Sequence, residues 1–165
     1  MERRKVRRFA VYQAARTDVR MFLGQFYHNL DDKGRLTIPA RYRELLPRFT
    51  YVMQGFERNL MVFPSPVFET IKQHISQMSM TDPKARLLRR MLYSTADQLE
   101  VDRAGRILIP QFLRQFANLN SSVVVVGNGD YFEIWSPDIW SEQRTMLEDV
   151  QANSERFVTF LLASD

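Results

Sequence analysis

An aspartate and an arginine stand four residues apart at two places in this chain. Asp31 and Arg35 form the first pair, and Asp102 and Arg106 form the second. A carboxylate at this spacing around a turn can hold a guanidinium in one rotamer. The arginine then loses less entropy when it donates to a phosphate or to the O6 and N7 acceptors of guanine. The chemistry alone leaves two interpretations, a nucleic-acid contact or a structural cross-strand salt bridge of about 0.2–1 kcal/mol.

Both pairs belong to a longer phrase that occurs twice. Residues 30–39 read LDDKGRLTIP, and residues 101–110 read VDRAGRILIP. The same register continues downstream, where Arg43 matches Arg114 and the pair Ser65-Pro66 matches Ser136-Pro137. A repeat of this kind predicts two small, similar modules that fold together as one pseudo-symmetric body.

Each phrase has the pattern of a β-hairpin followed by a helix. Gly34 and Gly105 stand where a short hairpin loop needs a residue in the left-handed region, which glycine reaches without steric cost. Apolar residues then alternate up to Pro39 and Pro110, which end the strands and can start helices. We expect strands at 25–30, 51–55, 60–63, 98–101, 123–127 and 131–135, and helices at 39–46, 66–77 and 137–147, with a further helix beginning at Asp82-Pro83.

Composition sets the broad class of protein. The chain has 165 residues, of which 45% are apolar, and no cysteine, so disulfides and thiolate ligands are excluded. No apolar run approaches the roughly 20 residues that span a bilayer, and residues 1–20 lack the pattern of a signal peptide, so we expect a cytoplasmic protein. Those 20 residues carry seven basic and two acidic side chains, so the overall charge of +4 leaves about −1 on residues 21–165.

The order of these features predicts five segments. Residues 1–20 form a basic extension, which is either native or an upstream reading, since Met21 directly precedes the first strand. The other segments are a first module (21–77), a helical connector (78–97), a second module (98–147) and a C-terminal packing segment (148–165). Large apolar side chains in the last segment predict that it packs against the body or against a neighbouring subunit.

Other functions find less support in the residues. The only histidines, His28 and His74, lie outside any recognisable nucleophile, P-loop or metal-ligand motif. We therefore predict no enzyme, no metal, no cofactor and no small-molecule substrate. The carboxylates Glu69, Glu133 and Glu142 are interpreted as solvated or capping, although two carboxylates with raised pKa values in one pocket would favour an enzyme. Phe56, Phe63, Phe68, Trp135 and Trp140 could stack on bases, but their positions favour core packing.

The two phrases resemble the MraZ family of bacterial transcriptional regulators, which are built from two AbrB-like (SpoVT-type) modules that each carry Asp-x-x-x-Arg. Both copies are intact here, and the resemblance covers residues 21 to about 160. It implies an α+β, mainly β fold, a pseudo-symmetric swapped-hairpin β-barrel with flanking helices. It also implies homo-oligomeric rings and binding to short repeated boxes in double-stranded DNA, upstream of the division and cell-wall gene cluster.

On this basis we expect a sequence-specific regulator that acts at the nucleoid. Arg35 and Arg106 would contact DNA with help from Lys33 and Arg103. Asp31, Asp102, Gly34 and Gly105 would orient the two loops. The alternative is an antitoxin-like module that binds a protein partner, although such chains usually carry one module and dimerise to complete the barrel.

Overall fold

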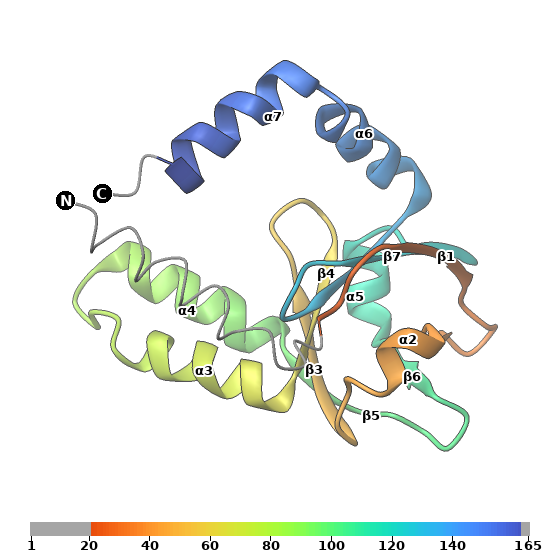
Figure 1. Cartoon of the computed structure of the whole chain (residues 1–165). Coiled ribbons are helices and arrows are strands. Elements are labelled where there is room, and N and C mark those ends of the chain that lie inside the picture. The colour runs from red at the N-terminus through yellow and green to blue at the C-terminus, as the bar shows by residue number, and fades with distance from the viewer. Residues whose placement is uncertain (1–20, 163–165) are drawn as a thin grey trace, which may run out of the picture.

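The structure is a computed structural model that describes residues 21–162 of the chain. The basic extension predicted for residues 1–20 lies outside the described residues, as do residues 163–165. Figure 1 shows a central group of strands, with helices α3 and α4 side by side on one flank and helices α6 and α7 rising from another. The arrangement is α+β with antiparallel strands, as the sequence predicts.

Eight strands make two antiparallel sheets. Six of them pair in the order β1-β7-β8-β4-β3-β5, while β2 and β6 pair only with each other. Their bounds are β1 Gln25–Asn29, β2 Arg35–Thr37, β3 Phe49–Gln54, β4 Leu60–Pro64, β5 Asp97–Glu100, β6 Arg106–Leu108, β7 Ser122–Gly127 and β8 Phe132–Trp135. The strands that the alternation predicts are therefore confirmed to within one or two residues.

The two halves of the chain are interleaved. Strand β1 of the first half pairs with β7 of the second, and β5 of the second half pairs with β3 of the first. The β2–β6 ladder also joins the halves, with Leu36 opposite Ile107. Neither half can therefore complete its own sheet alone.

The pairings do not close into a single barrel. The six-stranded order has two ends, at β1 and β5, and β2 and β6 form a separate ladder of three residues each. The arms of the first hairpin meet through one isolated bridge, between Leu30 and Leu36. The swapped exchange of strands is thus present, whereas the closed swapped-hairpin barrel stays a prediction.

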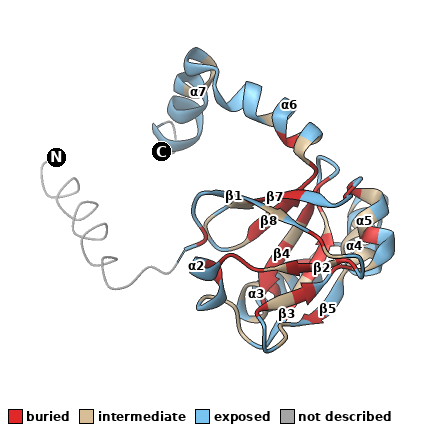
Figure 2. Ribbon diagram, turned by 90° about the vertical axis from the view of Figure 1, so that its right-hand side faces the viewer, coloured by how far each residue is buried: buried red, intermediate tan, exposed pale blue. Residues whose placement is uncertain are grey.

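The core lies beneath the β2–β6 ladder. Leu36, Ile38, Ile107 and Ile109 are all fully buried, and Figure 2 shows buried residues concentrated in the strands. Tyr42 packs among the aromatic rings beside this group and donates its hydroxyl to the carbonyl of Leu23 at 2.9 Å. Burial raises the pKa of Tyr42 to about 12.

Helices follow the strands where the proline signals predict them. Their bounds are α2 Ala40–Arg43, α3 Ser65–Ser76, α4 Pro83–Thr95, α5 Gln111–Phe116, α6 Pro137–Leu147 and α7 Val150–Phe157, followed by a π-helical turn, η1, at Val158–Leu162. Asp82 and Ser136 cap α4 and α6 by accepting backbone N–H groups. Ser65, the repeat equivalent of Ser136, is instead the first residue of α3 and donates to the carbonyl of Phe49.

Of the two alternatives expected for the C-terminal segment, packing on the body of its own chain is not seen in the described residues. Helices α6 and α7 lead away from the sheets, and α7 does not lie on the body of its own chain (Figure 1). Val150 and Phe157 are 82% and 55% exposed, and η1 is exposed throughout. The apolar side chains of α7 and η1 are therefore not buried within the described chain, because α7 leaves α6 at an angle and does not pack on the sheets (Figure 1). Packing against a neighbouring subunit stays a prediction.

The aromatic residues divide into two groups. Phe63, Phe68, Trp135 and Trp140 are buried, as core packing predicts. Phe56 is 64% exposed, because it lies in the turn between β3 and β4, so its assignment to the core was wrong. Within residues 21–162, no helix combines the length and apolar character needed to cross a bilayer.

Candidate nucleic-acid interface

The two Asp-x-x-x-Arg segments form matching loops. In the first, Asp31 N–H donates to the Arg35 carbonyl and Gly34 N–H donates to the Asp31 carbonyl, both at 3.0 Å. Both equivalent bonds in the second loop measure 2.9 Å. Gly34 and Gly105 have φ angles of +80° and +72°, the left-handed conformation that the hairpin pattern predicts.

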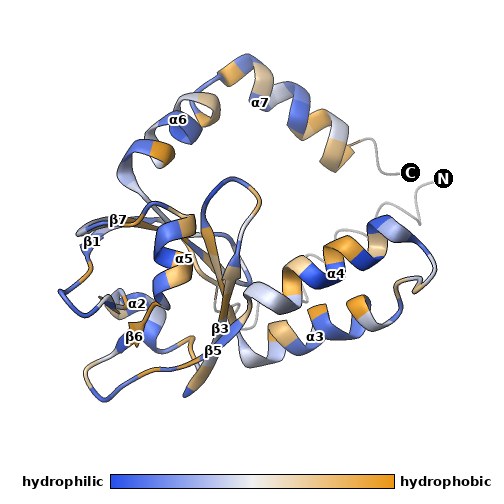
Figure 3. Cartoon of the chain, turned by 180° about the vertical axis from the view of Figure 1, so that it is seen from behind, coloured by the Kyte–Doolittle hydropathy of each residue, from blue (hydrophilic) through white to orange (hydrophobic). Residues whose placement is uncertain are grey.

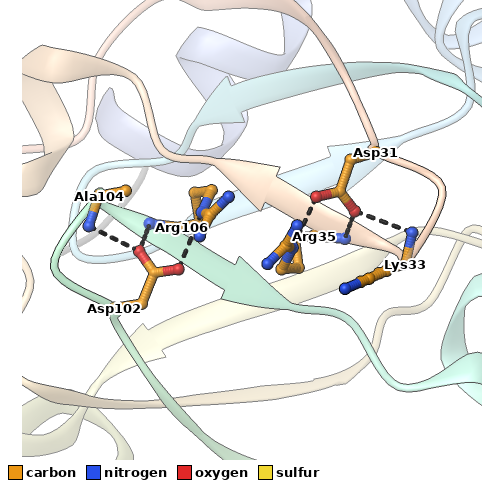
Figure 4. Close-up of polar contacts among 6 residues, drawn as sticks. All are labelled: Asp31, Lys33, Arg35, Asp102, Ala104 and Arg106. Atoms are coloured by element: carbon orange, nitrogen blue, oxygen red, sulfur yellow. Dashed lines mark hydrogen bonds and ion pairs between the residues drawn. The ribbon is translucent and has the colours of Figure 1, made fainter.

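Each aspartate holds the arginine of its own loop. Asp31 Oδ1 accepts the backbone N–H groups of Lys33 and Arg35, while Oδ2 accepts Arg35 Nε at 2.6 Å (Figure 4). In the second loop, Asp102 accepts the equivalent N–H groups and lies 2.8 Å from Arg106 Nε. Among the described residues, no hydrogen bond uses the Nη atoms of either arginine, and both side chains are partly exposed, so these donors are available to a ligand.

Both arginines lie on one face of the same ladder. Arg35 pairs with Leu108, and Thr37 pairs with Arg106, while Leu36 and Ile107 between them are buried. Because side chains alternate along a strand, Arg35 and Arg106 point to the opposite, outward face. Diagonal neighbours on such a ladder lie about 7–8 Å apart. Figure 4 shows the two side chains between the loops, so a single ligand could contact both.

Hydrogen bonds to the carboxylates shift their titration. The backbone N–H of Arg35 is the main cause that lowers the pKa of Asp31, and the Arg35 side chain adds to it. The backbone N–H of Arg106 lowers the pKa of Asp102 in the same way. Both groups therefore favour the ionised form, which keeps the arginines bound to them at neutral pH.

The lowered pKa values predict a specific response to acid. A carboxylate with a depressed pKa in the folded state stabilises the fold above its unfolded value, near 3.8, and loses that contribution as the pH falls through the folded value. We expect the Asp31→Asn/Asp102→Asn variant to melt at a lower temperature than the parent at neutral pH, with the gap closing in acid. Thermal unfolding followed by circular dichroism across this pH range tests it, with Asp130→Asn as the control. An equal gap at every pH would contradict the prediction.

Each loop is supported by the other half of the chain. A Cβ placed on Gly34 would lie 2.6 Å from Arg114 Cζ, and one on Gly105 would lie 2.7 Å from Arg43 Nε. The Nε of each arginine donates to the carbonyl just before its own proline: Arg43 to Ile38 at 2.9 Å, and Arg114 to Ile109 at 3.1 Å. The repeat showed that Arg43 and Arg114 are equivalent, but it did not show that each one packs on the opposite loop.

The loops also differ from each other. Lys33 is exposed at the tip of the first loop, where the second loop has Ala104. In the second loop, exposed Arg103 lines a surface hollow of about 580 Å³ together with Arg48. Arg48 Nε also pairs with Glu100 at 2.7 Å. The predicted basic residues Lys33 and Arg103 therefore lie in the two loops that flank the ladder. Arg48, which sequence reasoning did not assign to the site, lines the same hollow as Arg103.

Several known proteins are similar to this chain. The model of one family, described as "MraZ protein, putative antitoxin-like", matches twice, at residues 21–91 and 92–161. Among curated relatives, "Transcriptional regulator MraZ" of Roseiflexus castenholzii is 44% identical over 83% of this chain and 94% of its own length. The protein of the same name from Thermomicrobium roseum is 44% identical over 77% of this chain and 89% of its own. The protein of the same name from Moorella thermoacetica is 40% identical over 85% of this chain and 99% of its own length.

Both family matches contain one Asp-x-x-x-Arg loop each, and together they extend over nearly all of the described residues. This chain, with its two interleaved halves and paired loops, therefore belongs to the MraZ family.

Proposed function

We propose that this protein is a sequence-specific DNA-binding transcriptional regulator, and that Arg35 and Arg106 contact the DNA. The observation that carries the proposal is the position of both guanidinium groups on one outward face, each fixed at Nε by an aspartate. Fixed guanidinium groups suit the bidentate acceptors of guanine and the oxygens of phosphate. The relatives named as transcriptional regulators support the same function.

The neighbouring residues have supporting roles in this proposal. Lys33 and Arg103 contact phosphates at the loop tips, Asp31 and Asp102 orient the arginines, and the loop glycines give the turns their shape. The targets are repeated boxes upstream of the division and cell-wall gene cluster, including the protein's own promoter, as the family resemblance implies. Such a regulator acts in the cytoplasm, at the nucleoid.

Assembly into a homo-oligomeric ring is the second part of the proposal. Two helices, α4 and α7, carry exposed apolar side chains (Figure 3). On α4, Leu87 is 67% exposed, and on α7, Phe157 is 55% exposed. Contact between α7 of one copy and α4 of the next would cover both surfaces. A contact between two different surfaces of the same chain forms a ring when its rotation closes. Several loop pairs would then bind one DNA together, and their weak contacts would add up through effective concentration. Such avidity would explain how a body with a charge near −1 binds DNA.

Fluorescence anisotropy with the protein's own upstream duplex and a scrambled duplex tests this function. We expect tighter binding to the upstream duplex, and affinity that falls steeply as salt rises, because basic side chains release counterions from DNA. Equal affinity for the two duplexes would contradict a sequence-specific regulator. That result would favour the antitoxin-like alternative, in which the exposed C-terminal segment binds another protein.

A further inference from the structure

A second cavity lies away from the two Asp–Arg loops. It has a volume of about 310 Å³ and is bounded by the β3–β4 turn, the β7–β8 hairpin and α6. The residues that give it chemical character are Glu57, Asn128, Glu133, Trp135, Trp140 and Gln143. We call it the tryptophan pocket. A volume of this size suits a small ligand of a few heavy atoms.

Glu133 is a half-buried carboxylate whose hydrogen-bond partners are all neutral. Its Oε2 accepts Trp135 Nε1 at 2.9 Å, and its Oε1 accepts Asn128 Nδ2 at 3.2 Å. Burial raises the pKa of Glu133, and the charge of nearby Glu57 raises it further. This corrects the interpretation of Glu133 as a solvated or capping residue, because its position on β8 places it inside the cavity wall.

The wall of the pocket provides negative charge without a counter-ion. Its lining residues within 21–162 include two carboxylates and no lysine, arginine or histidine. In the same part of the chain, no ion pair involves Glu57 or Glu133. Behind them, fully buried Asn59 has an Nδ2 with no hydrogen-bond partner among the described residues, although it lies close enough to Glu133 to lower its pKa. Unbalanced carboxylates in a partly dry cavity favour a cationic occupant.

Aromatic rings form the apolar part of the same wall. The ring centroids of Trp135 and Trp140 lie 5.5 Å apart. Their indole N–H groups are already used, by Glu133 and by Gln25 Oε1 at 3.1 Å. The two rings therefore add apolar surface to the cavity wall and no unpaired indole N–H donor. Tryptophan provides the strongest cation–π contacts of the aromatic side chains.

We propose that the tryptophan pocket binds an alkylammonium or guanidinium group on a short apolar stem. The carboxylates would bind the charge, and the indoles with Val126 and Leu147 would contact the stem. The cation can come from a free small amine or from a lysine or arginine of another copy of this chain. Two carboxylates in one pocket are also what an enzyme would use, but the indole rings, Val126 and Leu147 beside them favour binding of an apolar stem over catalysis. This binding is independent of the proposed DNA contacts.

The chain reports on this pocket through its own fluorescence, because it has only two tryptophans and both line the cavity. Titration of the full chain with agmatine or 1,4-diaminobutane should change tryptophan emission in a saturable way. Butane-1,4-diol and sodium chloride at equal ionic strength should have no such effect. Glu133→Gln should weaken binding about tenfold or more, whereas Glu142→Gln, an exposed change on the same helix as Trp140, should not.

Protein concentration distinguishes the two sources of the cation. Saturable binding of the amine at every protein concentration indicates a free ligand. An emission change on concentrating the protein alone, lost in Glu133→Gln and reversed by agmatine, indicates a side chain from another copy. Glu57→Gln provides a second variant should Glu133→Gln fail to fold. The absence of both responses in the folded parent, by fluorescence and by calorimetry, would overturn the proposal.

Discussion

Replacing Arg35 and Arg106 together by alanine is expected to weaken binding to the upstream duplex by about 30-fold to 2 × 10⁴-fold. The range follows from a loss of about 1–3 kcal/mol for each well-placed arginine contact. The fold should tolerate the change, because partly exposed ion pairs contribute only about 0–1 kcal/mol to stability. Anisotropy titrations at one salt concentration, with thermal unfolding measured beside them, test both parts of the expectation.

A matched control separates the loops from overall charge. Lys72→Ala/Arg144→Ala also removes two ion-paired positive charges, from α3 and α6, outside both the Asp–Arg loops and the proposed ring contact. If it weakens binding as much as the loop variant, the effect is nonspecific electrostatics. If the loop variant instead unfolds at a much lower temperature, the Asp–Arg pairs are structural salt bridges. Single variants at Arg35 and Arg106 would then show which loop contributes more.

Replacing Ile107 by alanine should have the largest effect on stability, a loss of about 2–5 kcal/mol in the free energy of unfolding. Ile107 is fully buried opposite Leu36, in the ladder that joins the two halves. Truncation removes apolar contacts and leaves a cavity that the short strands cannot fill. Urea unfolding of the parent and the variant measures the difference.

The neighbouring residue provides the control for this change. Leu108 lies in the same strand but is 54% exposed, so Leu108→Ala should change stability by no more than about 0.5 kcal/mol. Equal losses at the two positions would mean that the ladder is not buried as described. A double-mutant cycle with Leu36→Ala should also show coupling, because the two side chains are in contact across the halves.

The features that the sequence predicted well are local ones. Gly34 permits the left-handed turn and Pro39 fixes its own φ whatever surrounds them, so the loop and the start of α2 followed from the residues themselves. The alternation around Leu36 predicted the buried face for the same reason. Two repeated phrases also carried enough shared spacing to indicate the family.

The features that it could not predict depend on distant pairing. Arg114 lies on Gly34 only because β2 pairs with β6, a register that neither phrase encodes alone. Glu133 and Glu57 meet for a similar reason, since β8 lies beside β4 in the sheet. The path of α7 away from the sheets depends on how α6 leaves β8, which no local signal sets.

The interleaving of two unequal halves has a consequence for the DNA target. In a dimer of identical halves the two loops would be equal, and the preferred site would be a palindrome. Here the first loop carries Asp32-Lys33 where the second carries Arg103-Ala104, because each half of a fused chain can change alone. The site contacted by one subunit should therefore have a direction. In the proposed ring, subunits related by rotation would then favour DNA boxes arranged head to tail over inverted pairs.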